Sequence, residues 1–534
     1  MAATQTSRAP LAAPAVPAGR WRLWWAGYGR PLTGAVAVGV LSGVLSAASM
    51  PRGPVTRGQA LVLLAGLLVA GVAAGVLLRS RWAVPLAPVA HLVGFEVTRA
   101  TVADVEGALF GPVHLGTSAG ALLFVVSHLF YAIVTVPPAV LGAIAGAAYA
   151  RRRRPSPARS PRSRARRIAG RAGLALRMSL TVLLAAGVAL AGFQLARPGQ
   201  VAPVLGSDGE PVPGSVATHE RIRLGGTDQW VSIRGRDVDN PVLLYLSGGP
   251  GGSDLALVRW NKRMEDSFTV AVWEQRGTGM SYASLDPTAE LTVDRMVADG
   301  IELTRWLRTR FDEQKIYMVG NSWGTILGVL MAQRAPELFW AYVGTGQMVS
   351  VAETDRILYR QSLAYAERIG DDSLAARLRA WGPPPYDDPL IDATAHATIG
   401  LLYEDLEPYD LAATEIRPNT MTNRFFHGEY GLLDSWNSLR GLADMFSVLY
   451  PRLQDVDLRT GADRLDLPVY VLEGRHELSA RRLPALDWYD KLQAPGKQLI
   501  WFERSGHNPQ FEEATRYTEL MSGTVLTATY GSSP

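Results

Sequence analysis

The sequence predicts an α/β protein: a mostly parallel, doubly wound sheet with a helical insert, preceded by an all-α membrane-spanning region. Two observations separate the two parts. Residues 1–200 carry 21 Arg and three acids, a net charge of +18, whereas the whole chain of 534 residues has a net charge of +4. The remainder therefore carries −14. From about residue 198, short apolar runs between turn residues alternate with amphipathic segments, which indicates strands alternating with helices.

The N-terminal segment 1–31 is rich in Ala and Pro and holds Arg20, Trp21, Trp24 and Trp25 directly before an apolar run. Basic and Trp side chains suit a cytoplasmic membrane interface. Segments 31–50 and 59–78 are apolar, contain no charged residue and have the length that crosses a bilayer as a helix. We therefore expect residues 1–31 to be cytoplasmic and 32–197 to form a transmembrane region.

Two further apolar segments contain proline. Segment 82–97 includes Pro85, Pro88 and Glu96, which favours a broken span or a re-entrant segment. Segment 118–150 lacks acidic and basic residues apart from one His and contains Pro137 and Pro138, which favours a kinked or tilted helix. With 178–195 as the last span, the region is expected to cross about five times.

Residues 151–177 hold eleven Arg and no acid. Such a run could bind nucleic acid, but between apolar spans it is typical of a cytoplasmic loop that contacts anionic lipid head groups. We expect this loop interpretation to hold and nucleic acid not to be a partner. The domain after residue 197 is then expected outside the cytoplasm, in a multi-pass protein of the cell membrane.

A Pro/Gly-rich linker, 198–214, leads into the predicted sheet. Residues 215–348 and 467–525 are expected to form its core, and the helical, acid-rich segment 349–466 to form a cap over the site. The predicted helix is 296–311, and the predicted strands are 220–224, 229–233, 241–246, 267–273, 315–319, 339–343, 468–472 and 498–502.

The strand at 315–319 breaks at Gly320-Asn321-Ser322-Trp323-Gly324 and continues as an apolar helix. This G-x-S-x-G turn presents the serine hydroxyl at a sharp elbow, with the helix N-terminus favouring a developing anion. The same spacing surrounds Ser118, but that copy follows no strand. Ser322 is therefore the predicted nucleophile.

A serine nucleophile needs a base, an orienting acid and donors for the oxyanion. His507 follows the last predicted strand and Glu477 the one before it, with Asp487 as an alternative acid. Gly249, in the glycine-rich run 248–252, and Trp323 are the predicted backbone donors, and Gly248 is a further candidate. A phosphate loop is the rival interpretation of that run, but no G-K-[ST] follows.

The runs Gly248-Gly249-Pro250-Gly251-Gly252, Gln275-Arg276-Gly277-Thr278-Gly279 and Gly320-Asn321-Ser322-Trp323-Gly324 resemble those of the proline iminopeptidase family of α/β-hydrolases. The resemblance covers roughly 215–525. It implies an α/β-hydrolase fold, serine hydrolysis without a metal or cofactor, and a helical cap.

The sequence departs from the family pattern at four positions. Ser247, Glu274 and Glu477 stand where the family usually has His, Asp and Asp. Thr422 stands where a cap Glu grips the substrate's free amine. The cap carboxylates that could substitute for that Glu are Glu404, Glu407, Glu415 and Glu429.

The sequence thus predicts a membrane-anchored serine hydrolase, and the resemblance implies an aminopeptidase that releases N-terminal residues from small peptides or amides. One alternative is a carboxylic-ester hydrolase of lipid-like or xenobiotic substrates. Another is a non-enzymatic membrane protein with a degenerate hydrolase domain. The chain has no cysteine, which excludes a thiol nucleophile and a Cys-ligated zinc. No metal site is expected.

Overall fold

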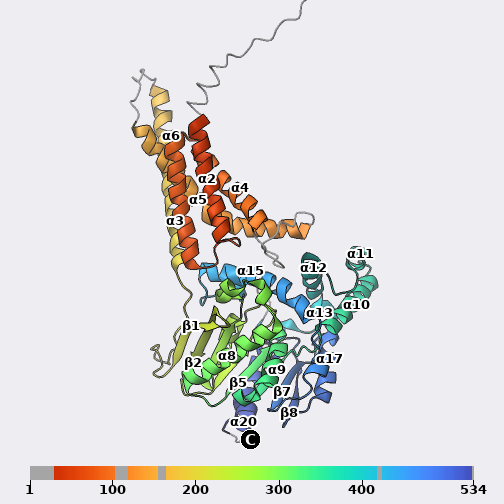
Figure 1. Cartoon of the computed structure of the whole chain (residues 1–534). Helices are drawn as coiled ribbons and strands as arrows, with labels where there is room; N and C mark the ends of the chain where they lie inside the picture. The colour runs from red at the N-terminus through yellow and green to blue at the C-terminus, as the bar shows by residue number, and fades with distance from the viewer. Residues whose placement is uncertain (1–28, 103–117, 154–163, 418–423, 532–534) are drawn as a thin grey trace, which may run out of the picture. The chain divides into compact units, whose positions relative to one another are not determined.

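The computed structural model describes residues 29–102, 118–153, 164–417 and 424–531, which divide into two compact units (Figure 1). The first unit takes in the described residues up to 53, 59–102 and 130–192. The second takes in 54–58, the described residues of 118–129 and everything described from 193 onward. The helices of the N-terminal region are α2 (Arg30–Ser49), α3 (Arg57–Leu78), α4 (Ala83–Val102), α5 (Ser118–Arg152) and α6 (Arg164–Ala196).

Four helical stretches in the described residues are long and apolar enough to cross a membrane: Arg30–Ser49, Arg57–Leu78, Val125–Arg152 and Ile168–Ala196. Helices of this kind pack through small residues because glycine lets two backbones approach. A Cβ added to Gly39 would lie 2.9 Å from the carbonyl oxygen of Ala87, so α2 and α4 are in close contact. Gly75 of α3 approaches α5 in the same way, with a Cβ 2.5 Å from the carbonyl oxygen of Ala143.

The structure corrects one local expectation for this region and adds helical detail to a second segment. Segment 82–97 is not broken: α4 is one helix with Pro88 inside it, since Pro85 falls in the first turn, where a missing N–H costs nothing. In the Arg-rich segment 151–177, α5 ends at Arg152 and α6 begins at Arg164, so most of the described residues of this segment are helical. Arg and Ala are strong helix formers, and no proline follows Arg164 before the apolar run.

In its described residues, the second unit is built on an eight-stranded sheet in the order β1-β2-β4-β3-β5-β6-β7-β8. The first two pairings, β1 with β2 and β2 with β4, are antiparallel, and all later pairs are parallel. The strands are β1 (Val216–Leu224), β2 (Thr227–Gly235), β3 (Val242–Leu246), β4 (Thr269–Glu274), β5 (Ile316–Asn321), β6 (Phe339–Thr345), β7 (Val469–Gly474) and β8 (Lys497–Phe502). Every predicted strand is confirmed.

Helices cover the sheet and fill the insert between β6 and β7. Those of the core are α7 (Leu255–Trp260), η2 (Lys262–Asp266), η3 (Gly279–Ser284), η4 (Thr288–Glu290), α8 (Val293–Phe311), α9 (Trp323–Arg334), η5 (Pro336–Leu338), α17 (Ser479–Lys491), α18 (Pro509–Glu512), α19 (Ala514–Glu519), η8 (Leu520–Val525) and α20 (Leu526–Thr529). Those of the insert are α10 (Val351–Ile369), α11 (Asp372–Trp381), α12 (Pro389–Gly400), α13 (Tyr403–Leu406), η6 (Leu411–Ala413), α15 (Leu432–Leu449), η7 (Tyr450–Leu453) and α16 (Leu458–Gly461).

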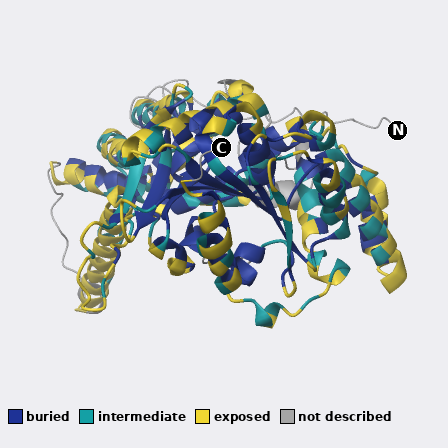
Figure 2. Cartoon of the chain, turned by 90° about the horizontal axis from the view of Figure 1, so that it is seen from below, coloured by how far each residue is buried: buried dark blue, intermediate teal, exposed yellow. Residues whose placement is uncertain are grey.

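The central strands are buried on both faces, as Figure 2 shows by their dark colour between the helices. Alternate residues of one strand enter different cores: Leu244 packs with Trp273 and Trp323, while Leu243 and Tyr245 pack in the cluster on the opposite face. This explains the near-continuous apolar runs in the sequence. The carboxyl ends of the parallel strands meet at one edge, where loops carry functional groups.

Segment 54–58, between α2 and α3, belongs to the second unit and contacts α15. Arg440 Nη2 donates to the carbonyl oxygen of Pro54 at 2.8 Å, and Asn437 Nδ2 donates to that of Val55 at 3.0 Å. Arg57 Nη2 lies 3.1 Å from Asp434 Oδ2. Arg440 and Asn437 are buried, so these hydrogen bonds satisfy polar groups that water does not reach.

Candidate active site

Ser322 lies between the end of β5 and the start of α9, with φ 53° and ψ −121°. A positive φ is unfavourable for a residue with a Cβ, and strain of this kind clusters at functional sites. The turn is possible because its neighbours are glycines. A Cβ on Gly320 would collide with the carbonyl oxygen of Gly324, and one on Gly324 with that of Leu246. The strand, turn and helix expected around Ser322 are therefore present.

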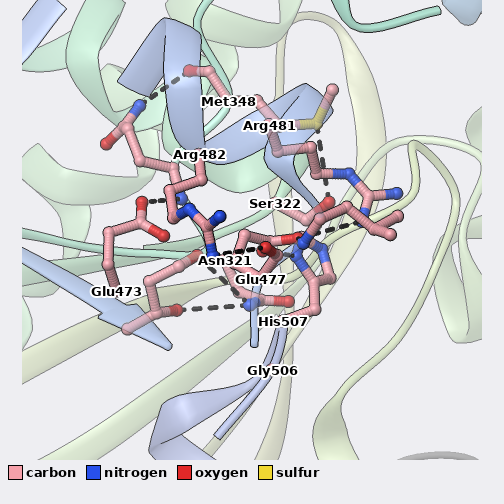
Figure 3. Close-up of polar contacts among 12 residues, drawn as sticks. Asn321, Ser322, Met348, Glu473, Glu477, Arg481, Arg482, Gly506 and His507 are labelled. Carbon is pink, nitrogen blue, oxygen red and sulfur yellow. Dashed lines mark hydrogen bonds and ion pairs between the residues drawn. The ribbon is translucent and has the colours of Figure 1, made fainter. Parts of the chain in front are cut away.

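Glu477 and His507 lie in the loops after β7 and β8, and the structure brings them together. His507 Nδ1 lies 2.5 Å from Glu477 Oε2 (Figure 3). If Nδ1 donates to the carboxylate, Nε2 is left as an acceptor. Among the described residues, the Ser322 hydroxyl donates to Met348 Sδ at 3.6 Å rather than to His507. Sulfur is a weak acceptor. The hydrogen bond between a catalytic serine and its histidine often forms fully only when substrate binds.

Glu477 is fully buried. Burial alone would raise its pKa, but His507 and Arg481 beside it lower the pKa to about 2, so the carboxyl is ionised at neutral pH. The backbone N–H of Leu478 also donates to Oε1 at 2.8 Å. Asp487, the alternative acid, instead accepts hydrogen bonds from Lys491 and Arg459. It therefore does not take the place of Glu477 beside His507.

A second carboxyl, Glu473, lies at the end of β7. Burial and the charge of Glu477 raise its pKa well above the ordinary value, which favours the neutral form beside an ionised Glu477. Its Oε1 accepts from the backbone N–H of Gln347 at 3.2 Å. Sequence reasoning did not single out Glu473, Met348 or Arg481.

The three candidate oxyanion donors lie around Ser322. A Cβ on Gly248 would lie 3.1 Å from Ser322 Cβ, so the glycine-rich loop passes directly beside the serine. The Gly248 N–H donates to Asp254 Oδ2 at 3.4 Å. Gly249 has a φ of +123°, a backbone conformation that glycine tolerates. Trp323 is the first residue of α9, where a backbone N–H has no partner within the helix.

The cap carboxylates proposed for a substrate amine are mostly engaged elsewhere. Glu429 accepts from Arg259 at 3.0 Å and from Ser232 at 2.9 Å. Glu415 accepts from the backbone and hydroxyl of Thr515, and Glu407 lies 4.0 Å from Arg482. Glu404 is exposed. Thr422 lies outside the described residues. No cluster of three or more metal-binding side chains occurs in the described part.

Residues 241–514, just over half of the chain, match the alpha/beta hydrolase fold family. The chain belongs to this family, and the predicted fold class and enzyme class, an α/β-hydrolase, are confirmed.

Two relatives have names that agree with the resemblance to proline iminopeptidases. A Bacillus subtilis protein named "Probable aminopeptidase" is 29% identical over 58% of this chain and 97% of its own. A proline iminopeptidase of Lactobacillus delbrueckii is 23% identical over 58% of this chain and 98% of its own. The solved proline iminopeptidase-related protein of Thermus thermophilus shares 17% identity, covering 59% and 98% of the two chains, with a TM-score of 0.40.

Proposed function

We propose that the chain is a membrane-anchored serine hydrolase, an aminopeptidase that releases N-terminal residues from small peptides or amides. The observation that carries this proposal is the strained Ser322 at the same sheet edge as the hydrogen-bonded pair of His507 and Glu477. The aminopeptidase and iminopeptidase names of the relatives support the substrate class.

In the proposed reaction, Ser322 Oγ attacks the scissile carbonyl carbon and its proton passes to His507 Nε2. Ionised Glu477 stabilises the resulting imidazolium through Nδ1. The backbone N–H groups of Gly249 and Trp323 bind the oxyanion. His507 then gives the proton to the leaving amine as the C–N bond breaks. Water attacks the acyl carbon while His507 accepts its proton, and His507 returns that proton to Ser322 Oγ as the acyl C–Oγ bond breaks.

The membrane part of the proposal rests on the four apolar helices and the charge beside the last one. Eleven Arg lie between residues 151 and 177, whereas Arg197 stands alone just beyond α6. Such a bias keeps the Arg-rich side in the cytoplasm and against anionic lipid. The hydrolase would then face the outside and meet extracytoplasmic substrates.

The test compares wild type, Ser322→Ala and Ser118→Ala in detergent, with Ser118 of the second G-x-S-x-G as the matched control. The substrates are proline 4-nitroanilide, its N-acetyl form and 4-nitrophenyl acetate. Ser322→Ala should lower kcat/KM at least about 10⁴-fold, because the nucleophile is lost, and Ser118→Ala should match wild type. Unchanged turnover by Ser322→Ala would remove this serine from the mechanism.

The same substrates separate the aminopeptidase from the esterase. An aminopeptidase should cleave the free proline anilide faster than the acetylated one. Equal rates on the two anilides would contradict the aminopeptidase proposal, and turnover of the ester alone would indicate a carboxylic-ester hydrolase.

A further inference from the structure

Arg481 lies in the first turn of α17, four residues after Glu477. Its Nη1 is 3.4 Å from Glu477 Oε1, while His507 occupies Oε2 of the same carboxylate (Figure 3). The buried Arg481 Nε has no hydrogen-bond partner among the described residues, and the side chain is 21% exposed. A guanidinium with spare donors is thus fixed on the carboxylate that orients the candidate base.

This guanidinium changes the charge of the site. The charges of Glu477, Arg481 and His507 sum to zero while His507 is neutral. They sum to +1 once His507 has accepted a proton. Burial and the charge of Glu477 raise the pKa of Glu473, which favours its neutral form. The site is therefore one unit more positive than an acid, base and serine alone, and charges act strongly where water is excluded.

A second arginine approaches from the insert. Arg424 Nη2 lies 3.0 Å from Asp254 Oδ1 and 3.2 Å from where a Cβ on Gly252 would be. Its side chain is 27% exposed, and its buried Nε has no hydrogen-bond partner in the part of the chain described. The same glycine-rich loop passes Ser322 at Gly248. Arg481 thus lies on the carboxylate that orients the candidate base, and Arg424 lies at the loop that passes beside Ser322.

From this arrangement we propose that the active site selects substrates that carry a carboxylate near the scissile carbonyl, with Arg481 binding that carboxylate and Arg424 assisting. A guanidinium fork matches a carboxylate in shape and charge. The carboxylate can be the C-terminus of a short peptide, on the leaving side, or an acid on the acyl side. The proposal rests on the proposed hydrolase function and specifies its substrate class.

The experiment measures kcat/KM for two matched substrate pairs. Prolyl-glycine is compared with prolyl-glycinamide for the leaving side, and adipoyl mono-4-nitroanilide with hexanoyl 4-nitroanilide for the acyl side. Wild type should prefer the carboxylate member of one pair about tenfold or more, since hydrogen bonds to charged groups are the strong ones. The pair that shows the preference identifies the side.

Arg481→Gln should bring this ratio close to one, and Arg481→Lys should keep part of it because the charge remains. Arg482→Gln is the matched control: it removes an adjacent charge whose guanidinium donates to the carbonyl oxygens of Arg475 and Glu477 instead. A purely structural role of Arg481 would lower kcat/KM for both members of a pair equally. A wild-type ratio near one, or a ratio unchanged in Arg481→Gln, would overturn the proposal.

A second measurement keeps the two proposals distinguishable if turnover is too slow. A fluorophosphonate should label Ser322, and failure to label it would count against the hydrolase function. If labelling occurs, adipate should slow it in wild type but not in Arg481→Gln, and neutral adipamide should slow neither. Equal effects of adipate and adipamide on labelling would contradict the proposed carboxylate site and leave the hydrolase function standing.

Discussion

The buried carboxyl of Glu274 joins three parts of the hydrolase unit. Ser253 Oγ, beside the glycine-rich loop, donates to it at 2.5 Å, Tyr430 OH of the insert donates at 2.6 Å, and the Met280 N–H of η3 donates at 3.1 Å. Burial raises its pKa to about 7, although these three donors lower it. The carboxyl thus ties the insert to the loop beside Ser322.

Because the folded pKa of Glu274 lies above its ordinary value of 4.5, the free energy of unfolding should fall as pH rises from about 4.5 to 7. Below that window both states are protonated, and above it both are ionised, so the loss is complete near pH 8. A shift of this size corresponds to roughly 3 kcal/mol. Glu274→Gln should lack this part of the pH dependence in thermal unfolding between pH 5 and 8. An identical pH profile for the variant would show that Glu274 does not titrate there.

The sequence was informative about residues that follow strands. Ser322, Glu477 and His507 each follow a parallel strand, and the carboxyl ends of parallel strands meet at one edge. Arg481 was missed because its approach to Glu477 depends on where α17 begins, and helix boundaries are poorly determined by sequence. The spacing of four residues from Glu477 was the available signal.

At the scale of elements, α15 supports the glycine-rich loop. A Cβ on Gly441 would lie 2.5 Å from the carbonyl oxygen of Gly277, and one on Gly251 would lie 2.5 Å from Met445 Cβ. Helix α15 therefore lies against the loop at Gly277 and the glycine-rich loop at Gly251 with no room for a methyl group. Any displacement of α15 would be transmitted to the loop beside Ser322.

Gly441→Ala should destabilise the protein by about 1–3 kcal/mol through overpacking, although alanine is the better helix former. It should also lower kcat/KM, because the loop carrying Gly249 would shift. Gly400→Ala, at the open end of α12 where no atom lies within 4 Å, is the matched control and should be neutral. Unfolding midpoints and kinetics for both variants check this. Equal stability of the two variants would mean that α15 accommodates the added methyl group without loss of unfolding free energy.

Strands were predicted better than the charged and proline-containing helices. Each central strand is a short buried apolar run, and its length and flanking turn residues distinguish it from a buried helix. The error at α4 arose because proline was interpreted as a break, yet a proline in the first turn is compatible with a helix. The insert was expected from its helical pattern, but its individual helices were not.

At the scale of the whole molecule, the hydrogen bonds from Arg440 and Asn437 to segment 54–58 restrict how often the chain can cross a membrane. If the chain spans a bilayer, that segment and the hydrolase must share one face of it, so the number of crossings between residues 58 and 198 is even. Between those residues, the described helices that are long and apolar enough to cross a membrane are three, in α3, α5 and α6. We therefore predict that α4 crosses as well, which gives the five-span arrangement expected from the sequence.

Since the chain has no cysteine, single thiols can report this parity directly. Ser80→Cys, between α3 and α4, should be shielded from a membrane-impermeant maleimide in intact cells and react after lysis, because an even count places it in the cytoplasm. Ser207→Cys, exposed in the hydrolase unit, is the outward-facing reference. Labelling of both in intact cells would mean that α4 does not cross. Segment 54–58 and the hydrolase would then lie on opposite sides of the bilayer, where no hydrogen bond could join them.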